Sequence, residues 1–347
     1  MKNIISTKQG MWKFYHDKNL GICFYGPKDD TPMILFEKGA PDFDAVCDNE
    51  GCIYLLCQDD KNNIYLYYYD KISWRKQCIL EARSAVPYDK NFTLLVTNGL
   101  VNAFYTIRHA KRTLLIHHIL DGEKEPTVIE TSPSPITYTV SSDGSNNIYC
   151  IYQKESIGFQ MFNWGIKEWQ NFSTLAVLPG ELRFISAICD LSDRLHITCS
   201  LRERSDYKVY YISKNGVQEI SDGFTRNPEP VILCTDQFYI LLKTNGRLLQ
   251  CTAKEPEQGF LKPTYYFPGS FCTHSLFKLS CSADLRLNKI FTGTVYGTEP
   301  RLNYFEAAII QENLDRIDFS PVSVPTLKIP DIETFVENAE PFNSTDS

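Results

Sequence analysis

Three observations on the sequence predict an all-β fold, a seven-bladed β-propeller of four-stranded antiparallel blades. A stretch of about forty-five residues recurs seven times, a length that suits a propeller blade and exceeds the coils of a β-solenoid. Each copy holds short runs of β-branched, aromatic and aliphatic residues bounded by Asn, Asp, Gly or Pro, as strands and turns do. No amphipathic helix of convincing length interrupts these runs.

The first hairpin turn of each copy marks the repeat. These turns are 41 to 49 residues apart and are anchored at Gly10, Gly51, Gly99, Gly144, Asp193, Asp236 and Leu285. Seven anchors predict seven blades. We expect a propeller domain over residues 1–324, with blades at 3–38, 43–81, 92–131, 136–178, 183–222, 229–269 and 276–324.

Within a blade the strands follow in order from the axis to the rim. In the first copy they are expected at 3–7, 12–16, 22–25 and 33–37, and in the second at 43–47, 52–58, 64–70 and 74–80. The chain then begins with an inner strand and ends with an outer one. We therefore expect no blade to be shared between the termini, and the ring to close by packing of blade 1 on blade 7.

Composition agrees with a large closed ring. The chain has 347 residues, of which 43% are hydrophobic and 13% aromatic, with 20 Tyr and 21 Phe. Flat sheets that stack face to face need many such rings, so we expect most tyrosines to pack between blades. The alternative for some of them is an aromatic platform that binds sugars.

The C-terminal segment differs from the repeats. Residues 325–347 contain one basic residue, Lys328, and five acidic ones, so they carry 1 − 5 = −4 of the net charge of −7. Three prolines and a polar end argue against further strands. The sequence predicts a short acidic tail that is extended or disordered, with docking of 332–336 on the ring or on a partner as the alternative.

Location and redox state are also predicted. The first nine residues lack the apolar core of a secretory signal, and no segment has the length and apolarity of a membrane span. Most of the 12 cysteines sit inside strands with apolar or aromatic neighbours: Cys23, Cys57, Cys150, Cys199, Cys234 and Cys281. We expect reduced, buried thiols in a cytoplasmic protein, with a few paired or redox-active thiols as the alternative.

No catalytic or metal motif survives inspection. Cys52 and Cys57 are five residues apart on one strand and so face opposite sides, and the six histidines show no ligand spacing. We expect neither a metal, a cofactor nor a catalytic residue. Acids recur at the first hairpin turns, at Asp48, Asp143, Asp190, Asp236 and Asp284. A short acid at a turn can bond its own downstream backbone, so these are interpreted as turn chemistry. The Asp-box of sialidase-like propellers has a different spacing from Ser141-Ser142-Asp143-Gly144.

Two turns carry a resemblance to known propellers. The segments Asp48-Asn49-Glu50-Gly51-Cys52-Ile53-Tyr54 and Asp190-Leu191-Ser192-Asp193-Arg194-Leu195-His196 resemble the Asp-x-x-Gly-x-Ile-His repeat. That repeat occurs in WD40-like or sialidase-like propellers, mostly uncharacterised, of clostridial and related bacteria. The resemblance spans about residues 3 to 324 and implies a cytoplasmic binding role without transferring any catalytic residue. The Trp-Asp and Gly-His pairs of true WD40 repeats are missing.

Candidate binding residues cluster in loops that should open on one face. Loops between the second and third strands, and those between blades, are expected to share a face, and they carry Arg83, Tyr88, Arg108, His109, Lys111, Arg112, Arg202 and Arg204. Such a basic patch could hold an acidic peptide, a phosphate or a polysaccharide, and ordinary solvated charges are the alternative. The net charge of −7, with no basic run, argues against nucleic acid.

Two classes of function remain open. The first is a non-enzymatic scaffold whose loops bind a protein or peptide partner. The alternative is a carbohydrate-binding or glycoside-hydrolase-like propeller with its site at the central channel. The expected inner strands are mostly apolar or hydroxylated, and few acids point to the axis, which favours binding over catalysis.

Overall fold

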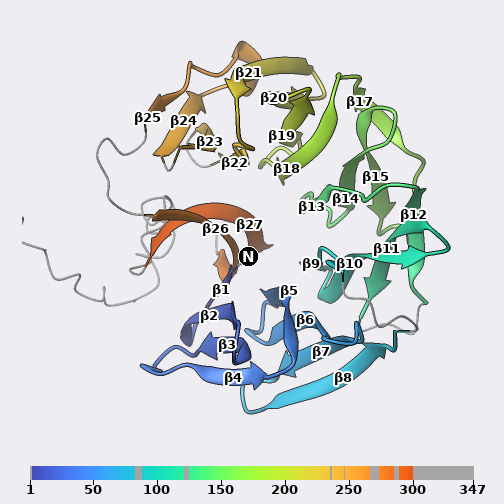
Figure 1. The fold of residues 1–347 in the computed structure, drawn as a ribbon, viewed down its shortest axis with the longest axis vertical. Coiled ribbons are helices and arrows are strands. Elements are labelled where there is room, and N and C mark those ends of the chain that lie inside the picture. The colour runs from blue at the N-terminus through green and yellow to red at the C-terminus, as the bar shows by residue number, and fades with distance from the viewer. Residues whose placement is uncertain are drawn as a thin grey trace, which may run out of the picture.

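The strands of the protein form six sheets arranged as blades around a central axis (Figure 1). The computed structural model describes residues 2–82, 88–120, 125–234, 237–245, 247–265, 273–284 and 289–299. In blades 2 to 6 the first strand lies nearest the axis and each later strand pairs antiparallel on its outer side. The prediction of an all-β propeller with mostly four-stranded antiparallel blades is confirmed.

The first three blades follow the same plan. Blade 1 holds β1 (Lys2–Thr7), β2 (Gly10–Asp17), β3 (Gly21–Tyr25) and β4 (Met33–Phe36). Blade 2 holds β5 (Gly39–Cys47), β6 (Ile53–Asp59), β7 (Ile64–Tyr69) and β8 (Trp74–Leu80). Blade 3 holds β9 (Thr93–Thr97), β10 (Leu100–His109), β11 (Arg112–Ile119) and β12 (Thr127–Ser132).

The next three blades vary the plan at the rim. Blade 4 splits its outer edge between two short strands, and its members are β13 (Tyr138–Ser142), β14 (Ile148–Gln153), β15 (Ile157–Asn163), β16 (Glu168–Trp169) and β17 (Ser173–Ala176). Blade 5 holds β18 (Glu181–Cys189), β19 (Leu195–Glu203), β20 (Asp206–Ser213) and β21 (Gly216–Phe224). Blade 6 holds β22 (Val231–Cys234), β23 (Phe238–Thr244), β24 (Arg247–Ala253), the 3-10 turn η1 (Pro256–Gln258) and β25 (Thr264–Tyr265).

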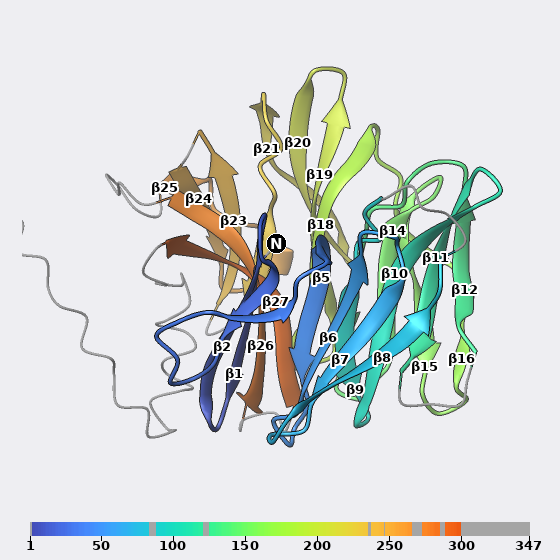
Figure 2. The same cartoon turned by 60° about the horizontal axis from the view of Figure 1, so that its bottom comes forward.

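The predicted seventh blade is wrong: the described strands form a ring of six blades. The hairpin of β26 (Thr273–Asp284) and β27 (Lys289–Glu299) joins the sheet of blade 1, because β26 pairs in parallel with β1 from Lys2↔Phe277 to Ser6↔Cys281. Figure 2 shows β26 beside β1 and β2. The expected closure by packing of two separate blades is therefore also wrong: the first and the last strands of the described residues share one sheet. The rest of the predicted blade and the acidic tail at 325–347 lie outside the described residues.

Burial explains why the hairpin joins blade 1. Phe277, Leu279 and Val295 pack with Ile4 of β1 and with Val231 and other apolar side chains of blade 6. A hairpin left alone would expose both the apolar face and a row of unpaired backbone groups at its edge. Pairing with β1 gives the backbone groups at the edge of β26 their hydrogen-bond partners. The apolar side chains of the hairpin then fill the seam between blades 6 and 1.

The hydrophobic core lies at the seams between blades. Six apolar clusters are distributed over the six seams, and in the cluster between blades 1 and 2 the ring of Trp12 lies 5.0 Å from Tyr69 and 6.4 Å from Trp74. Tyrosines are buried at several seams, among them Tyr67, Tyr105, Tyr152, Tyr210, Tyr211 and Tyr296. The predicted role of tyrosine in packing between blades is confirmed for these residues.

The acids at the hairpin turns are structural. The Oδ1 atoms of Asp48, Asp143 and Asp190 each accept the backbone N–H four residues later at 2.9 Å. Their Oδ2 atoms are bonded by the side chain six residues later, which is Tyr54 at 3.2 Å, Tyr149 at 3.1 Å and His196 at 3.2 Å. The predicted turn chemistry is confirmed, and the Asp and the aromatic residue of the resemblance motif are hydrogen-bonded partners. Asp236 and the side chain of Asp284 lie outside the described residues.

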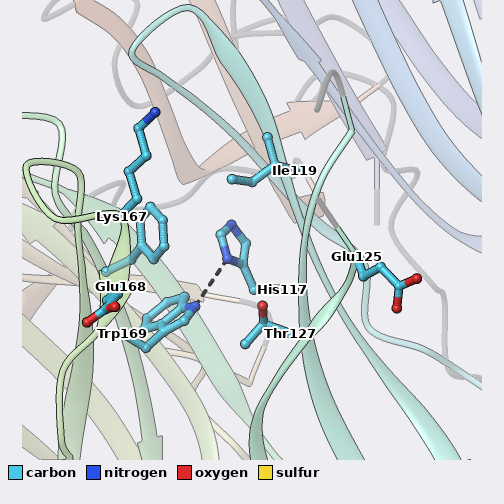
Figure 3. Close-up of a pocket in the computed structure, with 8 residues that line it drawn as sticks. His117, Ile119, Glu125, Thr127, Lys167, Glu168 and Trp169 are labelled. Carbon is cyan, nitrogen blue, oxygen red and sulfur yellow. Dashed lines mark hydrogen bonds between the residues drawn. The ribbon is translucent and has the colours of Figure 1, made fainter. Parts of the chain in front are cut away.

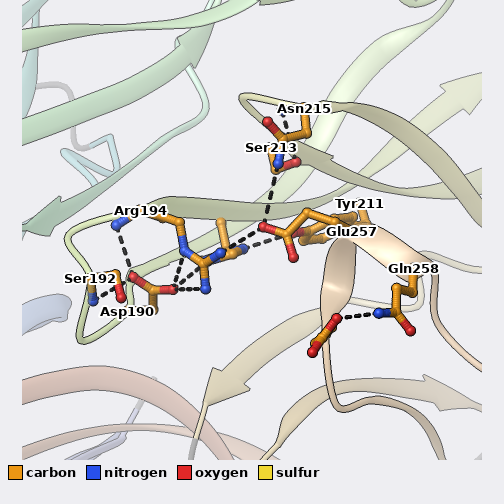
Figure 4. A network of polar contacts seen from close by, with 10 residues as sticks. Asp190, Ser192, Arg194, Tyr211, Ser213, Asn215, Glu257 and Gln258 are labelled. Atoms are coloured by element: carbon orange, nitrogen blue, oxygen red, sulfur yellow. Dashed lines mark hydrogen bonds and ion pairs between the residues drawn. The ribbon is translucent and has the colours of Figure 1, made fainter.

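At blade 5 this turn extends into a polar network that reaches blade 6 (Figure 4). The Arg194 guanidinium lies 2.7 Å from Asp190 and 2.8 Å from Glu257, which belongs to η1. Burial would raise the pKa of Asp190, but the hydrogen bonds donated by Arg194 and its neighbours outweigh it and lower that pKa. Burial lowers the pKa of His196, whose Nδ1 lies 2.7 Å from the Tyr211 hydroxyl. The network joins two blades and fixes the turn.

The predicted burial of the thiols is confirmed for most of the described cysteines, and their reduced state stays a prediction. The eleven cysteines in the described part of the chain are free, and most are buried inside strands. Burial raises the pKa of Cys199 and of Cys251 to about 12, so these thiols stay protonated at neutral pH. Among the described segments, no helix has the length and apolarity needed to cross a membrane.

Candidate functional site

Two cavities could receive a ligand. One, which we call the seam pocket, lies between blades 3 and 4 and has a volume of about 320 Å³. The other is the central channel, with a volume of about 540 Å³. Both volumes are in the range of small-molecule sites.

The seam pocket is built from two facing blades (Figure 3). Blade 3 supplies His117 and Ile119 from β11, Thr127 from β12, and Glu125 just before it; blade 4 supplies Phe162 from β15 with Lys167, Glu168 and Trp169 at β16. The turn between β15 and β16 is tight, because Asn163 Oδ1 accepts the Gly165 N–H at 2.8 Å and Lys167 has a positive φ of 56°. This turn places Trp169 against Phe162 in the pocket wall.

A chain of hydrogen bonds holds Trp169 in place. Its Nε1 donates to His117 Nδ1 at 3.2 Å, and His117 Nε2 lies 2.9 Å from Asn102 Oδ1. An indole N–H can only donate, so Nδ1 is the acceptor and the imidazole proton sits on Nε2, where it is donated to Asn102. Asn102 Nδ2 donates to Thr97 Oγ1 at 3.0 Å, and Thr97 Oγ1 also accepts from Trp164 Nε1 at 3.1 Å.

These bonds decide which groups a ligand can use. The His117 nitrogens and the Trp169 N–H are already bonded within the protein, so Trp169 offers its ring, which stands edge-on to His117 at 86° and 5.3 Å. Glu125, Lys167 and Glu168 are exposed and make no ion pair with any described residue. The pocket therefore has an aromatic surface, and two acidic residues and one lysine are among the residues that line it.

The central channel is lined by the inner strands β5, β9, β13 and β18 and by the hairpin β26–β27. Its walls are rich in hydroxyls, but they also hold a buried ion pair between Asp44 and Lys278, whose ammonium donates to Leu94 O at 3.1 Å as well. Burial raises the pKa of Asp44, and the Lys278 ammonium opposes that rise. The expectation of few acids on the inner strands overlooked Asp44, whose charge is balanced by a residue 234 positions away.

A second acid, Asp42, lines the channel beside this pair. Its Oδ2 accepts the backbone N–H of Asn91 at 3.0 Å and that of Lys90. Burial, together with the nearby Asp89 carboxylate, raises the pKa of Asp42 to about 6. Asp89 lines the same cavity.

The predicted basic residues fall into two separate groups. Arg108, His109, Lys111 and Arg112 lie together on the β10–β11 hairpin of blade 3, whereas Arg202 and Arg204 lie on the β19–β20 hairpin of blade 5 (Figure 1). The structure brings Tyr88 to the first group: its hydroxyl accepts the Arg108 N–H at 3.2 Å, and the guanidinium lies 4.8 Å from its ring centre. Arg83 lies outside the described residues. A binding role for these residues stays a prediction.

Sequence reasoning missed the seam pocket. One signal was present, since Trp164 and Trp169 are two of only four tryptophans and flank a turn that contains Lys167 and Glu168. The partners on blade 3 could not be found this way, because His117 lines the pocket from a strand far along the chain and Asn102 contacts His117 behind it.

No protein-family model matches the chain, and no curated protein matches it. Solved structures do match. An ulvan lyase of a new polysaccharide lyase family, bound to a chain of glucuronate and sulfated rhamnose, has a TM-score of 0.56 at 10% identity, over 87% of this chain and 90% of its own. A lectin from Burkholderia pseudomallei has a TM-score of 0.52 at 10% identity, over 74% and 80%. The fucose-specific lectin from Aleuria aurantia has a TM-score of 0.45 at 13% identity, over 78% and 96%.

At such identities a likeness shows the fold alone, and the first two likenesses agree with the β-propeller described above. They establish neither a family for this chain nor the bacterial origin that the turn motif implies.

Proposed function

We propose that the protein is a carbohydrate-binding propeller and that the seam pocket is its sugar site. The observation that carries this proposal is the fixed ring of Trp169 beside carboxylates and an ammonium that have no partner in the described structure. A pyranose has one face of C–H groups, which stacks on an aromatic ring, and hydroxyls that donate to carboxylates and accept from an ammonium. The pocket offers each of these contacts.

The structural neighbours support the same class of ligand. Among the solved structures that the chain resembles with TM-scores above 0.5 are a polysaccharide lyase and a lectin, so the proposal has a precedent on a comparable fold. It favours the carbohydrate alternative over the scaffold hypothesis.

The charges of the pocket indicate which sugars it takes. Glu125 and Glu168 contribute two negative charges against one positive charge from Lys167. A uronate or sulfated sugar would bring its own negative charge next to two carboxylates, and like charges at close range are unfavourable. We therefore expect neutral sugars to bind in preference to acidic ones.

A glycan array followed by calorimetric titration of the best neutral ligand tests the proposal. Trp169→Leu should weaken binding by about tenfold, because it removes the stacking surface and keeps an apolar side chain. Ile166→Ala is the matched control: it changes an exposed side chain of the same turn that does not line the pocket. If the folded protein binds no glycan, or if both variants lose affinity alike, the seam pocket is not the site.

A protein or peptide partner remains the competing proposal. It rests on the β10–β11 hairpin, where Arg108, His109, Lys111 and Arg112 are exposed beside Tyr88. Affinity capture from a lysate separates the two: a reproducible partner lost on Lys111→Glu and Arg112→Glu, without any glycan signal, would favour it. A cytoplasmic location and kinship with WD40-like bacterial propellers stay predictions.

A hydrolytic function at the central channel is the second part of the carbohydrate alternative. One observation favours it: Asp42, whose pKa burial raises to about 6, lines the same cavity as Asp89, and a glycosidase acts through a pair of carboxyl groups. Release of nitrophenol from a panel of aryl glycosides tests it. Loss of turnover in both Asp42→Asn and Asp89→Asn would support hydrolysis. If the unaltered protein turns over no substrate, the hydrolytic function is contradicted and only sugar binding stays as a proposal.

A further inference from the structure

We propose that the seam between blades 1 and 2 carries a binding site for organic cations of the quaternary ammonium class, which Lys76 occupies in the free protein. The site is an aromatic cage formed by Phe36, Tyr65 and Tyr67. The Lys76 Nζ lies 4.1 Å from the ring centre of Phe36, 4.0 Å from that of Tyr65 and 5.5 Å from that of Tyr67. The inference is independent of the sugar site, which lies at another seam.

The walls of the cage come from two blades. Tyr65 and Tyr67 alternate on β7 and so share one face of blade 2, while Phe36 ends β4 of blade 1. The Phe36 ring lies 5.5 Å from each tyrosine ring, at 75° to Tyr65 and at 42° to Tyr67. Tyr67 is buried and Tyr65 is tied to Asp59 by a hydrogen bond of 3.4 Å. The rings are therefore held in place by the fold and not by their occupant.

The occupant is held by the rings alone. Lys76 makes no ion pair with any described residue, and it is exposed on β8, the outermost strand of its blade. The negative faces of aromatic rings attract a cation within about 6 Å, with a contribution of about 0.5–1 kcal/mol per ring at exposed sites. An exposed side chain on an outer strand can leave the cage without disturbing the core.

The chemistry of the cage favours a quaternary ammonium over a primary one. The ammonium of lysine is a compact, strongly hydrated charge, and the rings offer its N–H groups no oxygen acceptor in place of water. A trimethylammonium group has no N–H to satisfy, and its methyl groups can contact all three rings. A ligand of this class should therefore displace Lys76.

The rest of blade 1 provides a comparison within the same protein. Lys13 lies over Tyr15 and Tyr25, but at 5.9 Å and 6.0 Å from their ring centres, and both rings belong to one blade. Two distant rings on one sheet do not surround a cation. We expect no quaternary ammonium to bind there.

Calorimetric titration with choline tests the proposal, with dimethylbutanol, its neutral carbon isostere, as the control ligand. Lys76→Ala should bind choline at least about tenfold more tightly than the unaltered protein, because the internal competitor is gone, whereas Lys13→Ala should not differ from it. Adding Phe36→Leu to Lys76→Ala keeps an apolar side chain but removes one ring, and should weaken choline binding about two- to fivefold.

Two outcomes of the choline titration would contradict the proposal. If folded Lys76→Ala binds no choline, or binds the neutral isostere equally well, the three rings are only packing and the proposal is wrong. Neither outcome bears on the seam pocket, because its sugar binding is measured with different ligands and variants.

Discussion

Replacement of Lys278 by methionine tests the buried charge pair that connects the β26–β27 hairpin to blades 2 and 3. Asp44 on β5 is 1% exposed and Lys278 on β26 is 8% exposed, and the ammonium also donates to the carbonyl of Leu94 on β9. The pair thus joins blades 2 and 3 to a hairpin that belongs to the sheet of blade 1. Lys278→Met keeps the length of the side chain and leaves the Asp44 carboxylate buried without its cation.

The expected cost is large. Removing one partner of a buried ion pair destabilises a protein by about 3–5 kcal/mol, because the remaining charge is neither hydrated nor paired. With a typical dependence on denaturant, the urea midpoint should fall by about 1 M or more. The loss should depend on pH. Burial raises the pKa of Asp44, and without Lys278 only the backbone hydrogen bonds from Leu94 and Ala45 oppose that rise, so the folded state binds a proton more readily than the unfolded one. The variant should then be least stable above the raised pKa and should regain stability as the pH falls toward about 4, the ordinary value for Asp.

Urea unfolding followed by tryptophan fluorescence at pH 7 and pH 5 measures both effects. The double variant Asp44→Asn with Lys278→Met should recover at least half of the loss at pH 7, since asparagine is neutral and its oxygen can still accept the N–H of Leu94. If Lys278→Met unfolds at the same urea concentration as the unaltered protein, the hairpin does not lie beside β5 and the closure of the ring described here is wrong. A double variant no more stable than the single one would show that buried charge is not the cause.

Three further predictions concern buried and exposed polar groups. Burial lowers the pKa of Lys90 from 10.5 to about 8, so between these pH values the unfolded chain holds a proton that the folded chain has lost. The free energy of unfolding should therefore rise by about 3 kcal/mol as the pH rises from 8 to 10.5. Lys90→Met, compared with the unaltered protein by urea unfolding across that range, should lack this rise. Asp143→Ala removes the acceptor of several turn hydrogen bonds, including that of Tyr149, and should lower the free energy of unfolding by about 1–3 kcal/mol in thermal or urea unfolding. Lys154→Ala is the control. An equal loss in that variant would point to a general effect of surface changes. Glu257→Gln breaks a half-exposed ion pair with Arg194 and should lower the free energy of unfolding by less than about 1 kcal/mol, a loss that added salt should abolish. A larger or salt-independent loss would contradict the minor contribution expected of this exposed pair.

Much of the fold could be predicted because strands and turns are local. Alternation of side chains along β7 or β19, and the acids at the hairpin turns, involve residues two to six positions apart, and the structure has strands and turns where those patterns predict them. The recurrence of Asp48 with Tyr54 and of Asp190 with His196 was visible in the sequence for the same reason.

The candidate sites could not be predicted in this way. The seam pocket joins His117 of blade 3 to Trp169 of blade 4, and the aromatic cage joins Phe36 to Tyr65 across another seam. In each case one partner comes from a neighbouring blade, and no spacing along one strand reveals which side chains meet there. The predicted basic residues lie on the hairpins where the sequence placed them, Arg108 on blade 3 and Arg202 on blade 5, and their binding role stays a prediction.

Short strands and tight turns in repeated units can be predicted from the amino-acid sequence, because those properties depend on neighbours along the chain. The number of blades depends instead on contacts between distant segments. The seventh repeat carries the same local signals as the others, yet β26 pairs with β1, at the opposite end of the described chain. That choice depends on the edge hydrogen bonds and the apolar seam that Ile4, Phe277 and Val231 complete together, and such long-range pairing leaves no periodic trace in the sequence.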